Sequence, residues 1–383
     1  MHEKRNKFLV YGCMMMIVFL SSFRAPDLEV ALNYAVPGYI QIIQNLSVPL
    51  VLLCMLLSIF LMVNVEREHA ETSVSLTLCF FIFQVIILLT EFSRQNNLAD
   101  FAIRLLFSTV TFFYFLKVVG KLSLYKTNGS SVLRAFFWGS FAFICLNLLL
   151  YKTGLATVMW KGRLFGLTAH PNFLGICAAI ETVLALLFFI EEKNWKNRTI
   201  YIAGAGLGAY VCLLTLSRTS MLGVVSAGFA FSFVAMKNSS FKPFFMILMV
   251  LVSVMLIANI TADSLDYADR GNTREQTWKE LYEDVAKLPI VGKGRTGAST
   301  NAYMFAIVAG GLVGAIFFYR SLFGAMASAY KDLLNTENFK RLAYLSILTL
   351  ILVTSVFEGY LLDTISIPAF TYWMLLTVTK QLA

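Results

Sequence analysis

Long uninterrupted runs of apolar residues dominate the sequence, and most of them approach the roughly 20 residues that a helix needs to cross a bilayer. Twelve segments of this kind are predicted, at 8–23, 44–64, 73–92, 100–120, 132–151, 171–190, 200–216, 219–236, 243–260, 301–319, 342–362 and 366–381. Only Ser217-Arg218 separates the seventh segment from the eighth. These two segments could instead form a single re-entrant loop, so the predicted number of spans is 10–12. Because the runs do not alternate with polar residues, a transmembrane β-barrel is excluded. The pattern predicts an all-α, polytopic helical membrane protein.

Composition supports the same class. Hydrophobic residues make up 58% of the chain and charged residues only 14%, whereas a soluble domain carries roughly 25% charged residues. A soluble enzyme, a disordered chain and a fibrous repeat are thereby excluded. The six cysteines all lie in apolar runs and there are three histidines, so the sequence predicts neither disulfides nor a metal site, and no cofactor.

The distribution of basic residues predicts the orientation. We expect the first apolar run, 8–23, to be a retained helix, because no small-residue cleavage pattern follows it. With the N-terminus inside, 18 Lys and Arg residues fall on the cytoplasmic side and 13 outside, six of the latter in one long loop, 261–300. Long loops do not contribute to the positive-inside bias, so both termini are predicted to be cytoplasmic. The net charge of +9 then reflects this bias and anion-binding positions, without a nucleic-acid partner.

The outer loop, 261–300, is the only long polar segment. Within it Trp278, Leu281, Val285 and Leu288 recur at helical spacing, and Pro289 follows. We expect an amphipathic helix on the outer face of the bundle. A helix that only shields apolar residues has the same pattern, so the periodicity does not assign a function.

Charged residues at the ends of membrane spans are the first candidates for function, because a central charge costs about 2.5–3.5 kcal/mol to insert. The predicted outer ends carry Glu91, Arg104, Arg163, His170, Arg218, Glu358 and Asp363, and the loop adds Arg270, Arg274 and Arg295. Arginine binds phosphate through a permanently charged, bidentate fork, so this set suits an anionic headgroup. The alternative is that these arginines anchor helices at the membrane interface. Glu181 lies in mid-span, where a carboxylate is either protonated or paired.

Three segments resemble the O-antigen ligase and polymerase family of bacterial membrane glycosyltransferases. They are Arg163-x-x-Gly166 with Pro171-Asn172, the Ser217-Arg218 junction, and the stretch from Arg270 and Arg274 through Trp278 and Asn301 to Gly310-Gly311. The resemblance covers about residues 160–320. It implies a GT-C-like fold with an N-terminal transmembrane bundle (1–160), a ligase/polymerase-like core (161–320) and C-terminal transmembrane helices (321–383).

The resemblance implies metal-independent transfer of a glycan from undecaprenyl diphosphate to a sugar hydroxyl outside the bacterial inner membrane. Arg218 and Arg274 match the two key arginines of the family, with Arg270 as an alternate for the second. Arg163 and Arg295 are further candidates for substrate contact. For the proton of the acceptor hydroxyl, we expect Glu358 or His170 as the base. Glu358 has an alternative structural role as an ion-pair partner of Arg104 or Arg218.

Position 300 separates the two activities of this family. Its ligases carry a His-Asn pair with a glycine eleven residues after the histidine; here Asn301 and Gly311 are present, but residue 300 is threonine. The missing histidine favours a repeat-unit polymerase of an O-antigen, capsule or exopolysaccharide. The expected partners are the lipid-linked oligosaccharide, membrane lipid, and a chain-length regulator and flippase of the same pathway. The alternatives are an O-antigen ligase and, in a different class, a flippase for a lipid-linked sugar.

Overall fold

The computed structural model describes residues 2–31, 37–63, 74–124, 129–156, 158–235, 273–287, 289–295, 300–333 and 339–378. Its helices are α1 (His2–Leu20), α2 (Leu28–Ala31), α3 (Gly38–Met62), α4 (Val74–Gln95), α5 (Leu98–Tyr114), the π-helix η1 (Phe115–Val119), α6 (Gly120–Leu124), α7 (Gly129–Thr153), α8 (Pro171–Glu191), α9 (Trp195–Leu214), α10 (Arg218–Ala235), α13 (Thr273–Ala286), α14 (Ala302–Leu333), α15 (Phe339–Ser355), the 3-10 helix η2 (Tyr360–Leu362) and α16 (Ile367–Val378). Two short strands, β1 (Met159–Trp160) and β2 (Arg163–Leu164), pair antiparallel.

The predicted all-α membrane architecture is confirmed at this level. Among the described residues, six helices are long and apolar enough to cross a membrane by length and composition, and three shorter apolar helices accompany them. Helices occupy eleven of the twelve predicted segments, and the other, 243–260, lies outside the described residues. The amphipathic helix expected in the outer loop is present as α13.

One predicted boundary is wrong. The segment 342–362 was expected to be helical throughout, but α15 ends at Ser355 and the chain then forms a turn with the short helix η2. Apolar residues such as Val356 and Phe357 continue the hydropathy signal past the end of the helix. The physical reason is that residues 356–366 supply backbone and side-chain groups to several other helices, as described below.

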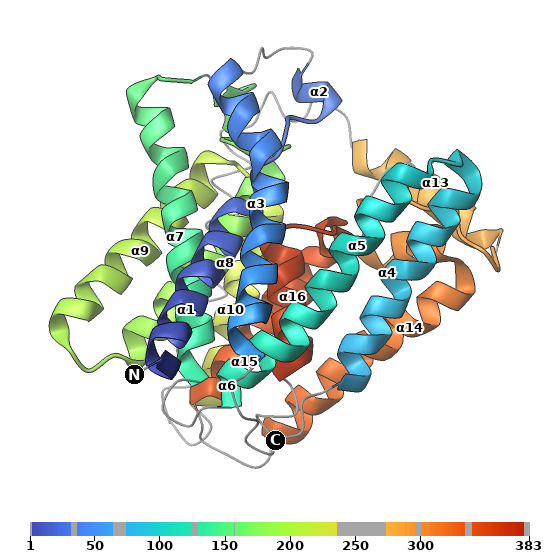
Figure 1. Ribbon diagram of the computed structural model, residues 1–383. Coiled ribbons are helices and arrows are strands. Elements are labelled where there is room, and N and C mark those ends of the chain that lie inside the picture. The colour runs from blue at the N-terminus through green and yellow to red at the C-terminus, as the bar shows by residue number, and fades with distance from the viewer. Residues whose placement is uncertain are drawn as a thin grey trace.

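Helix α8 forms the centre of the bundle. It packs along α9 and also contacts α7, α10 and α15. Most of its residues are buried, whereas most of those of α3 are not. Figure 1 shows α7, α8 and α9 on one side and α4, α5 and α14 on the other, with α16 between the two groups. One hydrophobic core runs through all three segments that the sequence divided at 160 and 320; that division stays a prediction.

Helix α14 is broken at a pair of glycines. Gly311 has φ 66° and ψ −175°, a conformation that L side chains rarely adopt. The break exposes backbone groups that pair with the preceding segment: Lys293 N–H donates to Val308 O (2.7 Å), Gly294 N–H to Ala309 O (3.0 Å) and Leu312 N–H to Pro289 O (2.9 Å). The segment 289–295 is thereby held against α14.

Candidate functional site

Arg163, Asn172 and Glu358 form a chain of hydrogen bonds near the N-terminal end of α8. Arg163 donates from Nε to the carbonyl of Thr215 (2.9 Å) and from Nη2 to Oδ1 of Asn172. Asn172 in turn donates from Nδ2 to Oε1 of Glu358, at 2.7 Å. Arg163 is 7% exposed and Glu358 is 8% exposed. The amide therefore links a buried cation to a buried carboxylate, and we call Arg163, His170, Asn172 and Glu358 the Asn172 cluster.

The local sequence explains how the backbone positions Arg163 and His170. Lys161 and Gly162 both have positive φ, at 48° and 74°, as the two-residue turn of a β-hairpin requires, and this hairpin places Arg163 on β2. His170 is the N-cap of α8, where its Nδ1 accepts a hydrogen bond from the backbone N–H of Asn172 (3.2 Å). Pro171 occupies the first turn, which suits its fixed φ.

The start of α10 lies beside the same cluster. Thr215, whose carbonyl accepts from Arg163, begins the tight turn between α9 and α10, and Leu216 in that turn has φ 48°. A Cβ atom on Gly175 of α8 would lie 2.8 Å from Ser217 Cβ, so the turn packs closely against α8. Arg218 is the first residue of α10 and is exposed. This predicted phosphate ligand thus lies at a helix start that adjoins Arg163.

Helix α13 also contacts the turn that carries Glu358. The Trp278 ring stacks on Phe357 with centroids 6.2 Å apart, and Leu281 is buried. Arg274 lies in the first turn of α13, whereas Arg270 lies outside the described residues. A small pocket of about 10 Å³ lies next to Glu358, and its lining includes Thr354, Ser355 and Tyr360; this volume is close to that of one water molecule.

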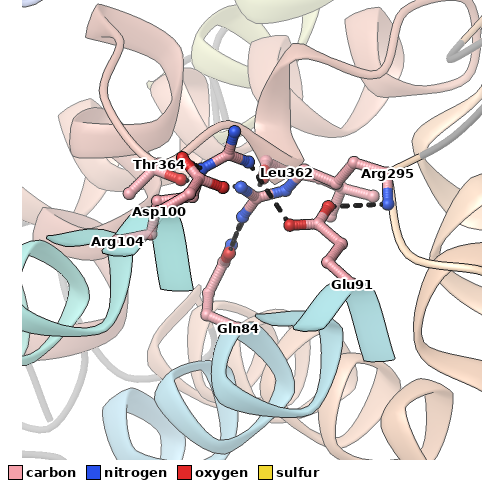
Figure 2. A network of polar contacts seen from close by, with 7 residues as sticks. All are labelled: Gln84, Glu91, Asp100, Arg104, Arg295, Leu362 and Thr364. Carbon is pink, nitrogen blue, oxygen red and sulfur yellow. Dashed lines mark hydrogen bonds and ion pairs between the residues drawn. The ribbon is translucent and has the colours of Figure 1, made fainter. Parts of the chain in front are cut away.

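Arg295 belongs to a second polar group, which we call the Arg295 cluster: Gln84, Glu91, Asp100, Arg104, Arg295 and Thr364. Figure 2 shows the guanidinium groups of Arg295 and Arg104 gathered around the side chains of α4 and the turn after α15. Arg295 donates from Nη1 to Thr364 Oγ1 (2.8 Å), from Nη2 to Gln84 Oε1, and from its backbone N–H to Glu91 Oε1 (2.7 Å). Arg104 contacts Glu91 Oε2 at 3.3 Å and Asp100 Oδ1 at 3.0 Å.

The two clusters are joined by the turn 356–366. Its Glu358 belongs to the Asn172 cluster, its Leu362 carbonyl accepts from Gln84 (3.4 Å) and its Thr364 accepts from Arg295. Between them Arg24 pairs with Asp363 at 3.1 Å. Burial raises the pKa of the Asp363 carboxyl, and the charges of Arg24 and Arg295 oppose that rise. One short segment thus receives side chains from α4, α8 and the chain after α1.

The side chain of Asn301 caps the start of α14. It is buried at the start of α14, where its Oδ1 accepts hydrogen bonds from the backbone N–H groups of Tyr303 and Met304, both at 3.0 Å. This is the geometry of a helix N-cap. Its predicted contact with substrate stays a prediction.

The structure therefore brings Arg163, His170 and Glu358 together, with Arg218 and α13 beside them, and places Arg295 in a separate cluster. Sequence reasoning quoted Asn172 only as part of a motif and did not predict that it links two candidates. It noted Glu91, Arg104 and Asp363 as outer-end charges without their partners. The signal for all of them was a polar residue at the edge of an apolar run.

Within the part of the chain that the structure describes, no group of three or more His, Cys, Asp or Glu side chains could hold a metal ion. The expectation of a metal-independent, cofactor-free protein stays a prediction. Comparisons with protein-family models, with curated proteins and with solved structures found no match.

Proposed function

We propose that the protein is a polysaccharide polymerase that transfers a growing glycan from undecaprenyl diphosphate to a lipid-linked repeat unit. In this proposal the chain spans the bacterial inner membrane 10–12 times with both termini cytoplasmic, in a GT-C-like arrangement. The Asn172 cluster faces the outside. The observation that carries the proposal is the hydrogen-bonded chain from Arg163 through Asn172 to Glu358, with Arg218 at the adjoining helix start.

The chemistry assigns roles to these residues. Departure of a lipid diphosphate builds negative charge, which cations fixed in advance stabilise. Arg218 and Arg274 supply this charge, and Arg163 supports it from its buried position. Glu358 accepts the proton of the attacking hydroxyl, because Asn172 holds one carboxylate oxygen and a small pocket lies beside this carboxylate. His170 is the alternate base.

Purified protein in lipid vesicles, supplied only with an undecaprenyl-diphosphate-linked repeat unit, tests the proposal. The wild type should produce a ladder of polymer lengths, and Arg218→Ala and Arg274→Ala should leave single repeats. Arg198→Ala is a matched control, because this arginine lies at the opposite end of α9, where it contacts Phe189. Wild-type ladders from both Arg218→Ala and Arg274→Ala would contradict the site.

The same assay separates the alternatives. A ligase would leave the repeat unit unpolymerised and transfer finished glycan when lipid A-core is added. A flippase would move the lipid-linked unit across the vesicle membrane without forming any glycosidic bond. Glu358→Gln should abolish polymer formation at unchanged protein level, since the amide keeps the contact geometry but cannot accept the proton.

A further inference from the structure

Glu181 lies in the middle of α8 and has no hydrogen-bond partner. It is 0% exposed, and both carboxylate oxygens lack a donor among the residues that the structure describes. Its position lies far from the Asn172 cluster, more than two helical turns from Asn172 along α8. The proposed glycosyl transfer makes no use of this group.

The Glu181 carboxyl faces a surface of small residues on α9. A Cβ atom placed on Gly208 would lie 2.0 Å from Glu181 Oε2, and one on Gly204 would lie 3.1 Å from Oε1. Any larger residue at Gly208 would therefore collide with the carboxyl group. The glycines allow α9 to approach α8 closely, and the approach encloses the acid.

Neighbouring hydrogen-bond donors are already used. Thr182 donates its hydroxyl to the carbonyl of Ala178 (2.7 Å), and the Cys212 thiol lies 3.5 Å from the carbonyl of Gly175, to which it donates. Among the residues that the structure describes, the titratable groups that face Glu181 from the packed helices are two thiols, Cys145 of α7 and Cys212 of α9. Lys, Arg and His side chains of the described residues form no ion pair with it.

An ionised carboxylate can only accept hydrogen bonds, and burying one without a donor or counter-ion is far more costly than burying the neutral acid. A protonated carboxyl group is neutral and needs no counter-ion, which suits a position where neither oxygen has a partner among the described residues. A larger cation would need several oxygen ligands at once. The proton is the one ligand that this enclosed position suits.

We propose that Glu181 is a proton-binding site inside the membrane bundle, protonated at neutral pH, and that α8 packs on the glycine surface of α9 in this protonated form. The consequence reaches the candidate site. Asn172 stands at the start of α8 and Thr215 at the end of α9, so the contact that Glu181 occupies holds together the two helices that carry these partners of Arg163.

Infrared difference spectroscopy of the purified protein in lipid vesicles tests this assignment. Subtracting the spectrum of Glu181→Gln from that of the wild type should leave the carbonyl band of one protonated carboxylic acid at neutral pH. Glu192→Gln is the matched control: its carboxylate accepts from Lys193 and Asn194 in an exposed turn, and the difference spectrum should show carboxylate bands instead. Carboxylate bands for Glu181 as well would overturn the proposal.

Three further measurements support or contradict the assignment. If Glu181→Gln does not fold, Glu181→Leu must remove the same carbonyl band. Gly208→Ala should shift the frequency of the band, whereas Gly206→Ala should not, because nothing lies within 4 Å of a Cβ at Gly206. The wild type should also lose stability relative to Glu181→Gln as the pH rises, since unfolding releases the proton. A stability difference independent of pH would contradict the proposal.

Discussion

The Arg295 cluster and the Asn172 cluster use the same kinds of side chain in different proportions. In the Arg295 cluster, Glu91 accepts from the backbone N–H of Arg295 and pairs with the Arg104 guanidinium, which also contacts Asp100. In the Asn172 cluster a neutral amide stands between Arg163 and Glu358, and further arginines begin α10 and α13. The first cluster holds as many carboxylates as guanidinium groups, and the second lies beside the helix that begins at Arg218. Under the proposed function, the Arg295 cluster stabilises the fold, whereas the Asn172 cluster takes part in the transfer.

The largest loss of stability is expected from disturbing the backbone contact between Gly292 and α14, which positions Arg295. A Cβ on Gly292 would lie 2.1 Å from Ala309 O and 2.5 Å from Gly311 N, and neither backbone atom can move without opening the break in α14. Gly292→Ala should cost about 4 kcal/mol or more of unfolding free energy, measured by equilibrium unfolding in mixed micelles. Gly206→Ala should be neutral or stabilising by up to about 1 kcal/mol. Similar stabilities for the two variants would contradict the close contact.

The two arginines of the Arg295 cluster should differ in the stability that they provide. Arg295→Ala removes the half-buried guanidinium that donates to Gln84 and Thr364. Because a hydrogen bond to a charged group contributes about 1.5–3 kcal/mol, we expect a loss of about 3 kcal/mol. Arg104 is 42% exposed at its side chain, and exposed pairs contribute up to about 1 kcal/mol, so Arg104→Ala should lose no more than that. In both variants, glycan transfer per folded molecule should be unchanged. A specific loss of transfer in Arg295→Ala would break the division between the clusters.

The substitution Asn172→Asp tests the role of the amide in the Asn172 cluster. The new carboxylate keeps the acceptor for Arg163 but replaces the donor to Glu358 with a like charge. Hydrogen bonds to charged groups contribute about 1.5–3 kcal/mol, so transfer should fall roughly 10- to 100-fold. Polymer formation in vesicles and thermal unfolding of the same sample are the two measurements. A variant that loses stability without losing activity per folded molecule would show that Asn172 only supports the fold.

The smallest effect concerns the ion pair that ties α13 to the segment before α14. Hydrogen bonding from Lys293 lowers the pKa of the Asp284 carboxyl, and Lys287 adds to this at 3.3 Å. A lowered pKa means that the contribution is present at neutral pH and is lost as the pH falls below the usual aspartate range through the lowered value. Lys293→Met should therefore reduce stability at neutral pH by less than about 1 kcal/mol, and by nothing in strong acid. A deficit that persists in acid would contradict the ion pair.

Much of the helical fold could be predicted from the sequence, because apolar runs of bilayer length have few alternatives to a helix in lipid. The amphipathic spacing of Trp278 and Leu281 likewise predicted α13. Hydropathy could not locate the end of α15, since Val356 and Phe357 are as apolar as the helix before them. The turn there is determined by partners that are distant in the chain.

The candidate site shows the same limit. The sequence supplied Arg163, His170 and Glu358 as charged or polar residues at span edges, and the structure brings them together, but their roles stay predictions. It could not show that Asn172 links them, because a single asparagine beside a proline is equally a helix start. Glu91 and the backbone of Arg295, 204 positions apart, pair only because Gly292 and Gly311 permit two backbones to touch. Such contacts depend on three-dimensional packing and leave no periodic signal.

The break in α14 has a consequence for how the chain enters the bilayer during synthesis. If α14 inserted alone, the carbonyls of Val308 and Ala309 would face lipid without partners, at a cost of several kcal/mol each. The segment that pairs with them, Pro289–Gly294, precedes α14 and so leaves the ribosome first. The segment that pairs with these carbonyls is therefore synthesised before α14 itself. We expect this order to let the carbonyls find their hydrogen-bond donors as soon as α14 enters the membrane.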